Sequence, residues 1–195
     1  MGEYELRSAR FLASDIQERV LRPGDTAVDA TLGNGHDACR LAALVGRRGK
    51  LIGFDVQEEA VRRSEALLRE NGLLDRCELH TVGHEHIAEV VREPVRLIVF
   101  NLGWLPGGDK RITTRWETTS RAVGDALTLL EPMGVLTLCA YPGHAEGETE
   151  LANLAQFFAS LRPQEYNVLH QRFLNAGPGA PECFVIQRQA TEKRL

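Results

Sequence analysis

The chain has 195 residues, of which 43% are hydrophobic and 26% charged, a composition that excludes an intrinsically disordered protein. No apolar run approaches the roughly 20 residues that span a bilayer, and the charged N-terminus has no signal-peptide core, so we expect a cytosolic protein. The formal net charge of −4 argues against broad, non-specific binding of nucleic acid, although a local basic patch could still meet one RNA element.

Short β-branched runs alternate with longer stretches of helical period along the whole chain. In chain order, the predicted elements are a strand at 26–31, a helix between Gly35 and Gly46, a strand at 50–55, a helix at 60–68 with Gly72 as C-cap, strands at 77–81 and 95–102, a helix at 122–130 before Pro132, a strand at 134–141, a helix at 151–161 before Pro163, and strands at 165–174 and 182–188.

This alternation predicts an α/β fold of Rossmann-like type, with a mostly parallel seven-stranded sheet and helices on both faces. Only residues 175–181 separate the last two strands, which leaves no room for a helix and predicts a C-terminal antiparallel hairpin. A parallel sheet that ends in such a hairpin is the arrangement of class I methyltransferases. We see no repeat, linker or low-complexity segment, so we expect residues 1–195 to form a single domain.

Four cysteines, Cys39, Cys77, Cys139 and Cys183, are widely separated in the sequence. They form no CxxC pair, have no spacing typical of metal ligands, and each lies in an apolar or strand-like stretch. We therefore expect four reduced, buried thiols and neither a disulfide nor a zinc site.

The most informative segment runs from residue 28 to residue 37, where the chain leaves a strand, turns on Gly33 and Gly35 and enters a helix. Glycines allow the backbone to turn tightly and approach a ligand, and a helix N-terminus offers unpaired N–H groups to an anionic group. About twenty residues later the second strand ends at Asp55, whose carboxylate can accept both hydrogen bonds of a ribose diol. Together these features predict a site for an adenosine-containing ligand, rather than a structural turn beside an unrelated aspartate.

Two kinds of adenosine cofactor fit the glycine spacing. Gly33-x-Gly35-x-x-Ala38 satisfies the dinucleotide fingerprint, which keeps a nicotinamide enzyme open. Asp29 favours S-adenosylmethionine, because a carboxylate before the glycine turn suits the ammonium of a methionine moiety and sits awkwardly beside a pyrophosphate. The arrangement also resembles methyltransferase motif I, with Thr31 where many members have a first glycine.

The loop after the third strand, Gly83-His84-Glu85-His86, is expected to reach the adenine in this fold, so His84 or Glu85 is a candidate contact to its edge. A solvated loop is the alternative. The His-x-His pair also suggests a metal, which we do not expect because no supporting cluster of carboxylates and histidines occurs elsewhere in the sequence.

A second motif, Asn101-Leu102-Gly103-Trp104, follows the fourth strand. Ligands meet the carboxyl ends of strands in open α/β sheets, so this loop is expected to border the reactive methyl group. Asn101 and Trp104 have the spacing of the Asn-Pro-Pro-aromatic motif of amino-group methyltransferases, in which the Asn carbonyl and a loop carbonyl accept hydrogen bonds from the target amine. Leu102 and Gly103 replace the prolines, so the loop can differ in shape. The plainer alternative is that Asn101 caps a turn and Trp104 fills the core.

Three segments together, 29–37, 101–110 and 141–144, are similar to the YtqB-like or MnmM family, and the similarity runs from about Leu12 to Arg188. Trp104 stands where many members have tyrosine. The resemblance implies a class I methyltransferase that uses S-adenosylmethionine to methylate the 5-aminomethyl group of wobble (2-thio)uridine in the tRNA anticodon, giving 5-methylaminomethyluridine. It also implies a homodimer.

The predicted site residues form three sets. Cofactor contacts are expected from Asp29, Thr31, Gly33, Asn34, Gly35, His36, Asp37, Asp55, Gln57, His84, Glu85 and Asn101. The catalytic candidates are Asn101, Trp104, Asp109 and His144. Substrate contacts are expected from Leu102, Gly103, Lys110, Arg111, Thr113, Thr114, Arg115 and Tyr141, whose basic, hydroxyl and aromatic groups suit phosphates and bases.

A free aliphatic amine has a pKa of about 10 and must lose a proton before it attacks. Asp109, His144 and Glu148 are candidate proton acceptors, and no base is needed if the neutral amine binds. Two other functions stay open: methylation of rRNA or of a small amine, and a module that binds S-adenosylmethionine without turnover. The loop at 101–110 argues against the last, since a sensor needs no acceptors for an amine.

Overall fold

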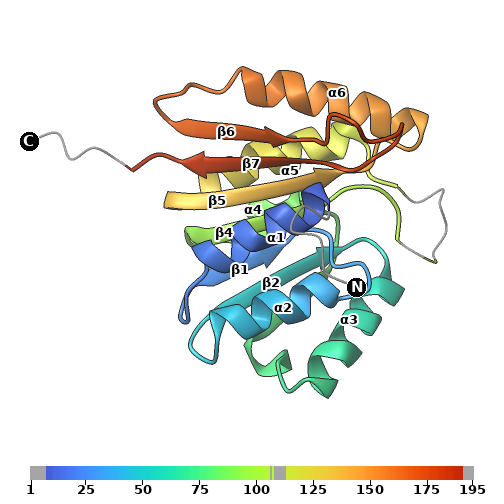
Figure 1. Ribbon diagram of the computed structural model, residues 1–195. Coiled ribbons are helices and arrows are strands. Elements are labelled where there is room, and N and C mark those ends of the chain that lie inside the picture. Colours follow the sequence, from blue (N-terminus) through green and yellow to red (C-terminus); the bar gives the residue numbers. More distant parts are fainter. Residues whose placement is uncertain (1–7, 106, 108–112, 191–195) are drawn as a thin grey trace, which may run out of the picture.

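The computed structural model describes residues 8–105, 107 and 113–190, which form a layered α/β structure around a seven-stranded sheet (Figure 1). The strands are β1 (Thr26–Asp29), β2 (Lys50–Asp55), β3 (Cys77–Thr81), β4 (Val95–Asn101), β5 (Leu130–Ala140), β6 (Tyr166–Gln171) and β7 (Glu182–Arg188). Their order across the sheet is β3-β2-β1-β4-β5-β7-β6. Strands β1 to β5 pair in parallel and β7 runs antiparallel to both β5 and β6, which confirms the predicted sheet and its C-terminal hairpin.

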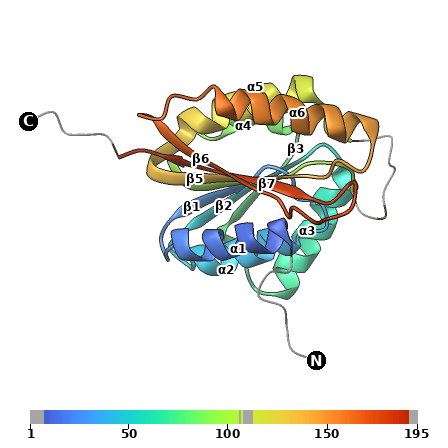
Figure 2. The same ribbon diagram turned by 45° about the horizontal axis from the view of Figure 1, so that its top comes forward.

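Helices cover both faces of the sheet, as predicted (Figure 2). They are α1 (Ala9–Val20), α2 (His36–Val45), α3 (Glu58–Glu70), α4 (Ile87–Val90), α5 (Trp116–Leu129) and α6 (Ala145–Ala159), with short 3₁₀ turns at Leu74–Arg76 and His84–His86. Alternate residues of each strand enter opposite cores: Val28 and Ile98 pack with α4 to α6, whereas Ala27 and Leu97 pack with α1 to α3. In the described part of the chain, no helix is long and apolar enough to cross a bilayer.

Helix α1 was not predicted, because its buried side consists mainly of small or polar residues. Ala9 and Ala13 pack against β5 and β7, and the buried amide of Gln17 donates to the hydroxyl of Thr137 on β5 at 2.7 Å. Ser8 caps the helix by accepting from the Phe11 N–H. An apolar stripe built from alanine gives a weak periodic signal, so α1 is specified by the surface on which it packs.

The prediction of four free thiols is wrong for Cys139 and Cys183, which form a disulfide between β5 and β7. The two residues are direct partners in the antiparallel register, with their Cα atoms 4.3 Å apart. They are 44 residues apart in sequence, so only the register of the C-terminal strands brings them together. Cys39 and Cys77 are free and partly buried, and burial raises the pKa of the Cys77 thiol to about 11.

Candidate active site

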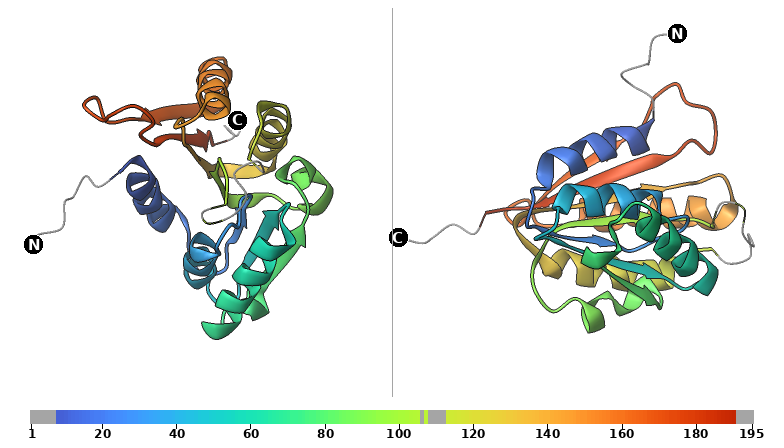
Figure 3. Two further views of the ribbon diagram at one scale, coloured as in Figure 1. Left: turned by 90° about the vertical axis from the view of Figure 1, so that its right-hand side faces the viewer. Right: turned by 90° about the horizontal axis from the view of Figure 1, so that it is seen from below.

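A cavity of about 720 Å³ opens at the carboxyl ends of the parallel strands, on the side of the molecule seen in the left view of Figure 3. The chain order reverses between β1 and β4, and open α/β sheets bind ligands at such a switch point. The described residues that line the cavity are Arg10, Ala30, Thr31, Leu32, Gly33, Asn34, His36, Asp37, Asp55, Val56, Gln57, Gly83, His84, Glu85, Asn101, Leu102, Gly103, Trp104, Leu105, Thr113, Thr114, Arg115, Thr118 and Tyr141.

The glycine turn between β1 and α2 has a backbone that favours glycine at two positions. Gly33 and Gly35 have φ of 53° and 81°, and the Gly35 N–H donates to the Leu32 carbonyl at 2.9 Å. Gly35 is also the N-cap of α2, where a Cβ would lie 2.7 Å from the Cα of Ser64 on α3. Gly33 therefore shapes the cavity wall, and Gly35 lets α2 and α3 approach each other behind it.

We expect Gly35→Ala to lower the free energy of unfolding by about 2 kcal/mol, because it adds a steric overlap with Ser64 to an unfavourable positive φ. Gly72→Ala is the matched control, since Gly72 has φ of 64° and, apart from its chain neighbours, no described residue has an atom within 4 Å of the added Cβ. That variant should lose only about 1 kcal/mol. Urea denaturation of both variants measures the difference, and equal losses would contradict the close packing of α2 on α3.

Asp55 is held at the end of β2 by two backbone N–H groups. Its Oδ2 accepts from Gly33 and its Oδ1 accepts from Gln57, both at 2.9 Å. A carboxylate has about four lone-pair sites, so each oxygen can accept another hydrogen bond. The carboxylate lines the cavity, where it can accept from both hydroxyls of a ribose.

Asp29 lies behind the cavity lining. Its side chain is fully buried, Oδ1 accepts from the Thr31 N–H at 3.1 Å, and Oδ2 has no hydrogen-bond partner among the described residues. Burial, followed by the negative charge of Asp37, raises the pKa of Asp29 to about 7. Asp29 thus supports the glycine turn between β1 and α2 from beneath the cavity lining, to which Thr31 and Asp37 belong.

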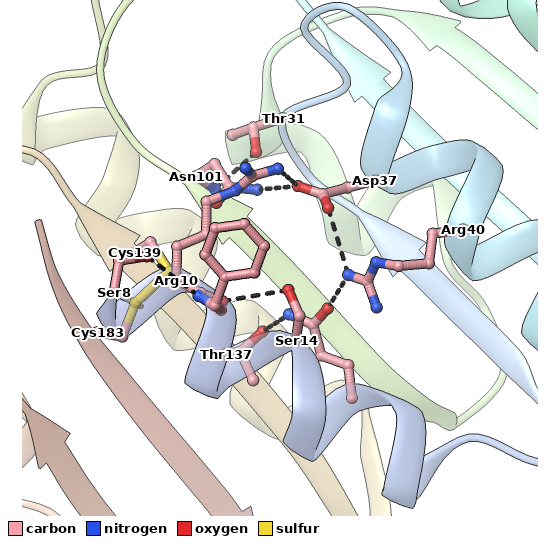
Figure 4. Close-up of a disulfide and its surroundings, with 12 residues drawn as sticks. Ser8, Arg10, Ser14, Thr31, Asp37, Arg40, Asn101, Thr137, Cys139 and Cys183 are labelled. Atoms are coloured by element: carbon pink, nitrogen blue, oxygen red, sulfur yellow. Dashed lines mark hydrogen bonds and ion pairs between the residues drawn. A yellow bond between two sulfur atoms is a disulfide. The ribbon is translucent and has the colours of Figure 1, made fainter. Parts of the chain in front are cut away.

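Asn101, at the end of β4, is fixed by two hydrogen bonds (Figure 4). Its backbone N–H donates to Thr31 Oγ1 at 2.7 Å, and its side-chain Nδ2 donates to Asp37 Oδ2 at 3.0 Å. The same Asp37 oxygen accepts from Arg10 of α1 at 2.9 Å, and Arg40 lies 3.3 Å from Oδ1. Burial opposes ionisation of Asp37, but these two arginines outweigh it and hold the pKa of Asp37 below its usual value.

His84 is nearly buried on the adenine side predicted from the sequence. Its ring packs edge-on against Phe100 with centroids 5.7 Å apart, and Nε2 is buried with no hydrogen-bond partner in the part of the chain that the structure describes. Burial lowers the pKa of His84, which favours the neutral ring. Glu85 and the neighbouring Gly83 also line the cavity, so this turn does border the site.

The loop after Asn101 is clamped at its base. The Gly103 N–H donates to Thr114 Oγ1 at 2.9 Å, the Thr114 N–H donates back to the Gly103 carbonyl at 3.1 Å, and Trp104 pairs with Thr113 as a β-bridge.

The Trp104 ring packs on the His144 ring with centroids 4.6 Å apart. His144 caps α6, because Nδ1 accepts from the Gly147 N–H at 3.1 Å. His144 therefore supports Trp104 from outside the cavity lining.

Glu150 of α6, which the sequence did not single out, anchors this clamp from the core. Its side chain is buried, and it accepts from Thr114 Oγ1 at 2.8 Å and from Thr119 Oγ1 at 2.6 Å. Burial raises the pKa of Glu150, although the two threonine hydroxyls act against this. The Thr114 hydroxyl is thus engaged inside the protein, between Gly103 and Glu150.

We expect Glu150→Ala to lower the free energy of unfolding by about 2 kcal/mol and kcat by about tenfold, since it leaves the buried Thr119 hydroxyl and the partly buried Thr114 hydroxyl without their acceptor and loosens the Gly103 loop. Glu150→Gln keeps the shape and one acceptor, so it should retain most of both. Gln156→Ala, at an exposed position on the same helix, controls for helix propensity. Thermal unfolding and methyl-transfer rates test this, and a fully active Glu150→Ala would show that the clamp is dispensable.

The structure gathers most of the predicted residues around one cavity. Three described exceptions, Asp29, Gly35 and His144, lie behind its wall. Glu148, a candidate proton acceptor, is exposed on α6 and does not line it. The remaining predictions, Asp109, Lys110 and Arg111, lie outside the described residues.

Three lining residues, Arg10, Val56 and Thr118, lie outside the motifs that the sequence analysis singled out. Arg10 belongs to a helix that was not predicted, and Thr118 follows the loop in the first turn of α5. Val56 is 58% exposed although it is apolar, and the sequence alone does not show this exposure.

The family model described as “Putative rRNA methylase” matches residues 51–187. A chloroplastic Arabidopsis thaliana protein named tRNA (mnm(5)s(2)U34)-methyltransferase is 32% identical over 193 residues, covering 94% of this chain and 70% of its own. A Clostridium thermocellum crystal structure that carries the same description as the family superposes with a TM-score of 0.93, at 34% identity, over 95% of this chain and all of that one. A Streptococcus mutans methyltransferase structure in complex with SAH has a TM-score of 0.85, at 31% identity, over 93% and 98% of the two chains.

The relative and the two structures cover 93% to 95% of this chain, and the family model spans residues 51–187. They confirm the predicted family, the Rossmann-like fold and S-adenosylmethionine as the cofactor. The chain belongs to the family described as “Putative rRNA methylase” and is an S-adenosylmethionine-dependent methyltransferase of the RNA-methylase type.

Proposed function

We propose that the protein methylates the 5-aminomethyl group of wobble (2-thio)uridine in tRNA and so forms 5-methylaminomethyluridine. The observation that carries this proposal is Asn101 on the wall of the cofactor cavity, three positions before the aromatic Trp104, in a chain whose Arabidopsis relative is named for this modification. An amide acceptor at the reacting centre suits an amine. The amide oxygen has no comparable role toward an aromatic carbon nucleophile, because such a carbon carries no N–H for it to accept.

The residues present fit S-adenosylmethionine. The free lone pairs of the Asp55 carboxylate suit the ribose hydroxyls, and the exposed side chain of Val56 and the turn at Gly83–Glu85 suit the adenine. The Gly33 turn and the first residues of α2 would hold the methionine moiety, above the buried Asp29. When bound, the cofactor supplies a methyl group on a positively charged sulphur, which the lone pair of an amine can displace.

The chain's own contribution to the reaction is then chiefly positioning. The Asn101 carbonyl oxygen accepts an N–H of the neutral substrate amine and so directs its lone pair toward the methyl group. The Trp104 ring, supported by His144, offers a face on which the uracil can stack. A side-chain base is not required, because an amine that binds neutral attacks first and loses its extra proton afterwards.

Residues of the same cavity wall are the proposed contacts to RNA. Arg115, at the N-terminus of α5, and Tyr141, after β5, both line the cavity and suit a phosphate and a base. Lys110 and Arg111 remain proposals on the sequence alone. A homodimer also stays a proposal, drawn from the family resemblance.

The direct test is methyl transfer from labelled S-adenosylmethionine to bulk tRNA and to rRNA, both from cells that lack the corresponding gene. Nucleoside mass spectrometry of the product identifies the modified base. A gain of one methyl on 5-aminomethyluridine in tRNA supports the proposal. Labelled rRNA or a labelled small amine beside unlabelled tRNA would overturn the proposed substrate and leave the cofactor assignment intact.

A further inference from the structure

Three side chains from different elements form a continuous polar chain at the cavity wall (Figure 4). Arg10 of α1 donates to Asp37 of α2 at 2.9 Å, and Asn101 of β4 donates to the same carboxylate oxygen at 3.0 Å. All three residues line the cavity. Helix α1 thus reaches the reacting end of the site through one arginine.

The carboxylate of Asp37 determines which way the Asn101 amide faces. An ionised carboxylate only accepts hydrogen bonds, so Asn101 must present its nitrogen to Asp37 and its carbonyl oxygen to the other side. Because the Asn101 backbone N–H is fixed on Thr31, the side chain has little freedom to turn as a whole. A neutral, protonated Asp37 could instead donate to the carbonyl oxygen and occupy the group that the amine needs.

Two arginines keep this carboxylate charged, and they are held differently. Arg40 is held by a second contact inside the protein, because it also donates to the buried Gln17, which in turn donates to Thr137 at 2.7 Å. Arg10 is 41% exposed and lies at the cavity, where it meets Asp37 on the oxygen that Asn101 shares. Arg10 is therefore the partner whose loss changes the Asn101 contact most directly.

We infer that Asp37 is a positioning residue rather than only a cofactor contact, and that Arg10, acting through Asp37, keeps the Asn101 carbonyl turned toward the substrate amine. The inference rests on the proposed amine substrate for its catalytic consequence. The geometric part, that Arg10 and Asp37 set the state of the Asn101 amide, is independent of the substrate.

The activity test is a double-mutant cycle. Arg10→Met should lower kcat by about tenfold with little change in the Kd for S-adenosylmethionine, and Arg10→Lys should recover most of the rate because it keeps the charge. In an Asn101→Ala background, Arg10→Met should have no further effect, since the group on which it acts is gone. A similar loss of kcat in both backgrounds, or a loss confined to cofactor affinity, would overturn the inference. Arg19→Met is the matched control, because Arg19 lies on the same helix and donates only to the Asp15 carbonyl among the contacts described for its side chain.

A second measurement needs no substrate. In protein labelled with ¹⁵N-asparagine, the Asn101 side-chain NH₂ signals are identified by their disappearance in Asn101→Ala. We expect them to shift in Arg10→Met and in Asp37→Asn, and to stay near their wild-type positions in Arg10→Lys and Arg19→Met. Unshifted signals in Arg10→Met would overturn the inference even if tRNA is methylated. Shifted signals with no methylation of tRNA would leave the inference about the amide in place and count against the proposed substrate.

Discussion

Asn101→Ala is expected to lower kcat for methyl transfer by about 100- to 1000-fold, the range found when one acceptor or donor at a reacting centre is removed. The reason is that the variant keeps the backbone N–H that donates to Thr31 but loses the carbonyl that orients the amine. The Kd for S-adenosylmethionine should stay within about threefold, because Asp55 and the glycine turn are untouched. Single-turnover kinetics and calorimetric titration with the cofactor measure the two quantities separately.

The control for Asn101→Ala is Asn71→Ala, which removes an exposed asparagine whose side chain, among the contacts described for it, donates to the Leu67 carbonyl near the end of α3. That variant should transfer methyl groups at the wild-type rate. Equal losses of cofactor affinity and rate in Asn101→Ala would place Asn101 among the cofactor contacts and would count against an amine-positioning role.

The same pair of measurements separates an enzyme from a cofactor-binding module. A protein that only senses S-adenosylmethionine has no rate to lose, and its Kd would be unaffected by the Asn101 carbonyl. The decisive quantity is therefore the change in kcat at unchanged Kd.

The strands and the helices α2 and α3 were predicted from the sequence to within a few residues, whereas α5 and α6 begin at Trp116 and Ala145, before the apolar stripes that marked them. The strands of the parallel sheet are short β-branched runs, and the helices between them carry leucine and valine stripes that end at glycine or proline. The start of β5 was placed too late because Leu130 already pairs with Val95, while the following residues, including Met133 at φ of 66°, bulge out of the register.

The candidate site was predictable where residues that are close in sequence act together. The glycine turn, Asp55 and the Asn101 loop are local motifs at strand ends, so topology alone brings them to one cavity. Arg10 and Glu150 reach the site from helices distant in sequence, and nothing in their local sequence distinguishes them from surface residues. The same holds for Cys139 and Cys183, whose pairing depends on strand register.

Whether a site residue faces the cavity or lies beneath its wall could not be predicted from the sequence either. Asp29 was expected to meet the methionine ammonium because of its place before the glycine turn. The structure puts its carboxyl beneath the cavity wall, with no exposed surface. Whether a strand-end carboxylate faces a ligand or the core depends on the exact twist of the turn that follows it, which no spacing rule encodes.

The buried Asp29 leads to a pH dependence of stability with a definite sign. Its ordinary pKa of 3.8 applies to the unfolded chain, and in the folded protein the value is about 7. The folded state therefore holds this proton more tightly. The stability that Asp29 contributes is fully present below about pH 4 and is lost as the pH rises through about 7, a change of about 4 kcal/mol in total and about 3 kcal/mol between pH 5 and pH 8.

Asp29→Asn should remove this dependence. Urea denaturation at pH 5 and pH 8 gives the free energy of unfolding of each protein, and the wild type should lose about 3 kcal/mol more than the variant between the two conditions. Asp15→Asn, at an exposed position of α1, controls for the change in net charge. The same pH dependence in Asp29→Asn and wild type would show that the carboxyl is not the group that titrates.

A second variant tests the cause of the raised pKa. Burial raises the pKa of Asp29 most, the negative charge of Asp37 comes second, and the charge of Asp55 raises it less. The Thr31 N–H and Arg40 lower the pKa. Asp37→Asn removes that charge, so the pKa of Asp29 should fall and the loss of stability should be complete at a lower pH. An unchanged pH dependence in Asp37→Asn would show that burial alone raises the pKa of Asp29 and that the two carboxyl groups do not interact beneath the methyl-transfer site.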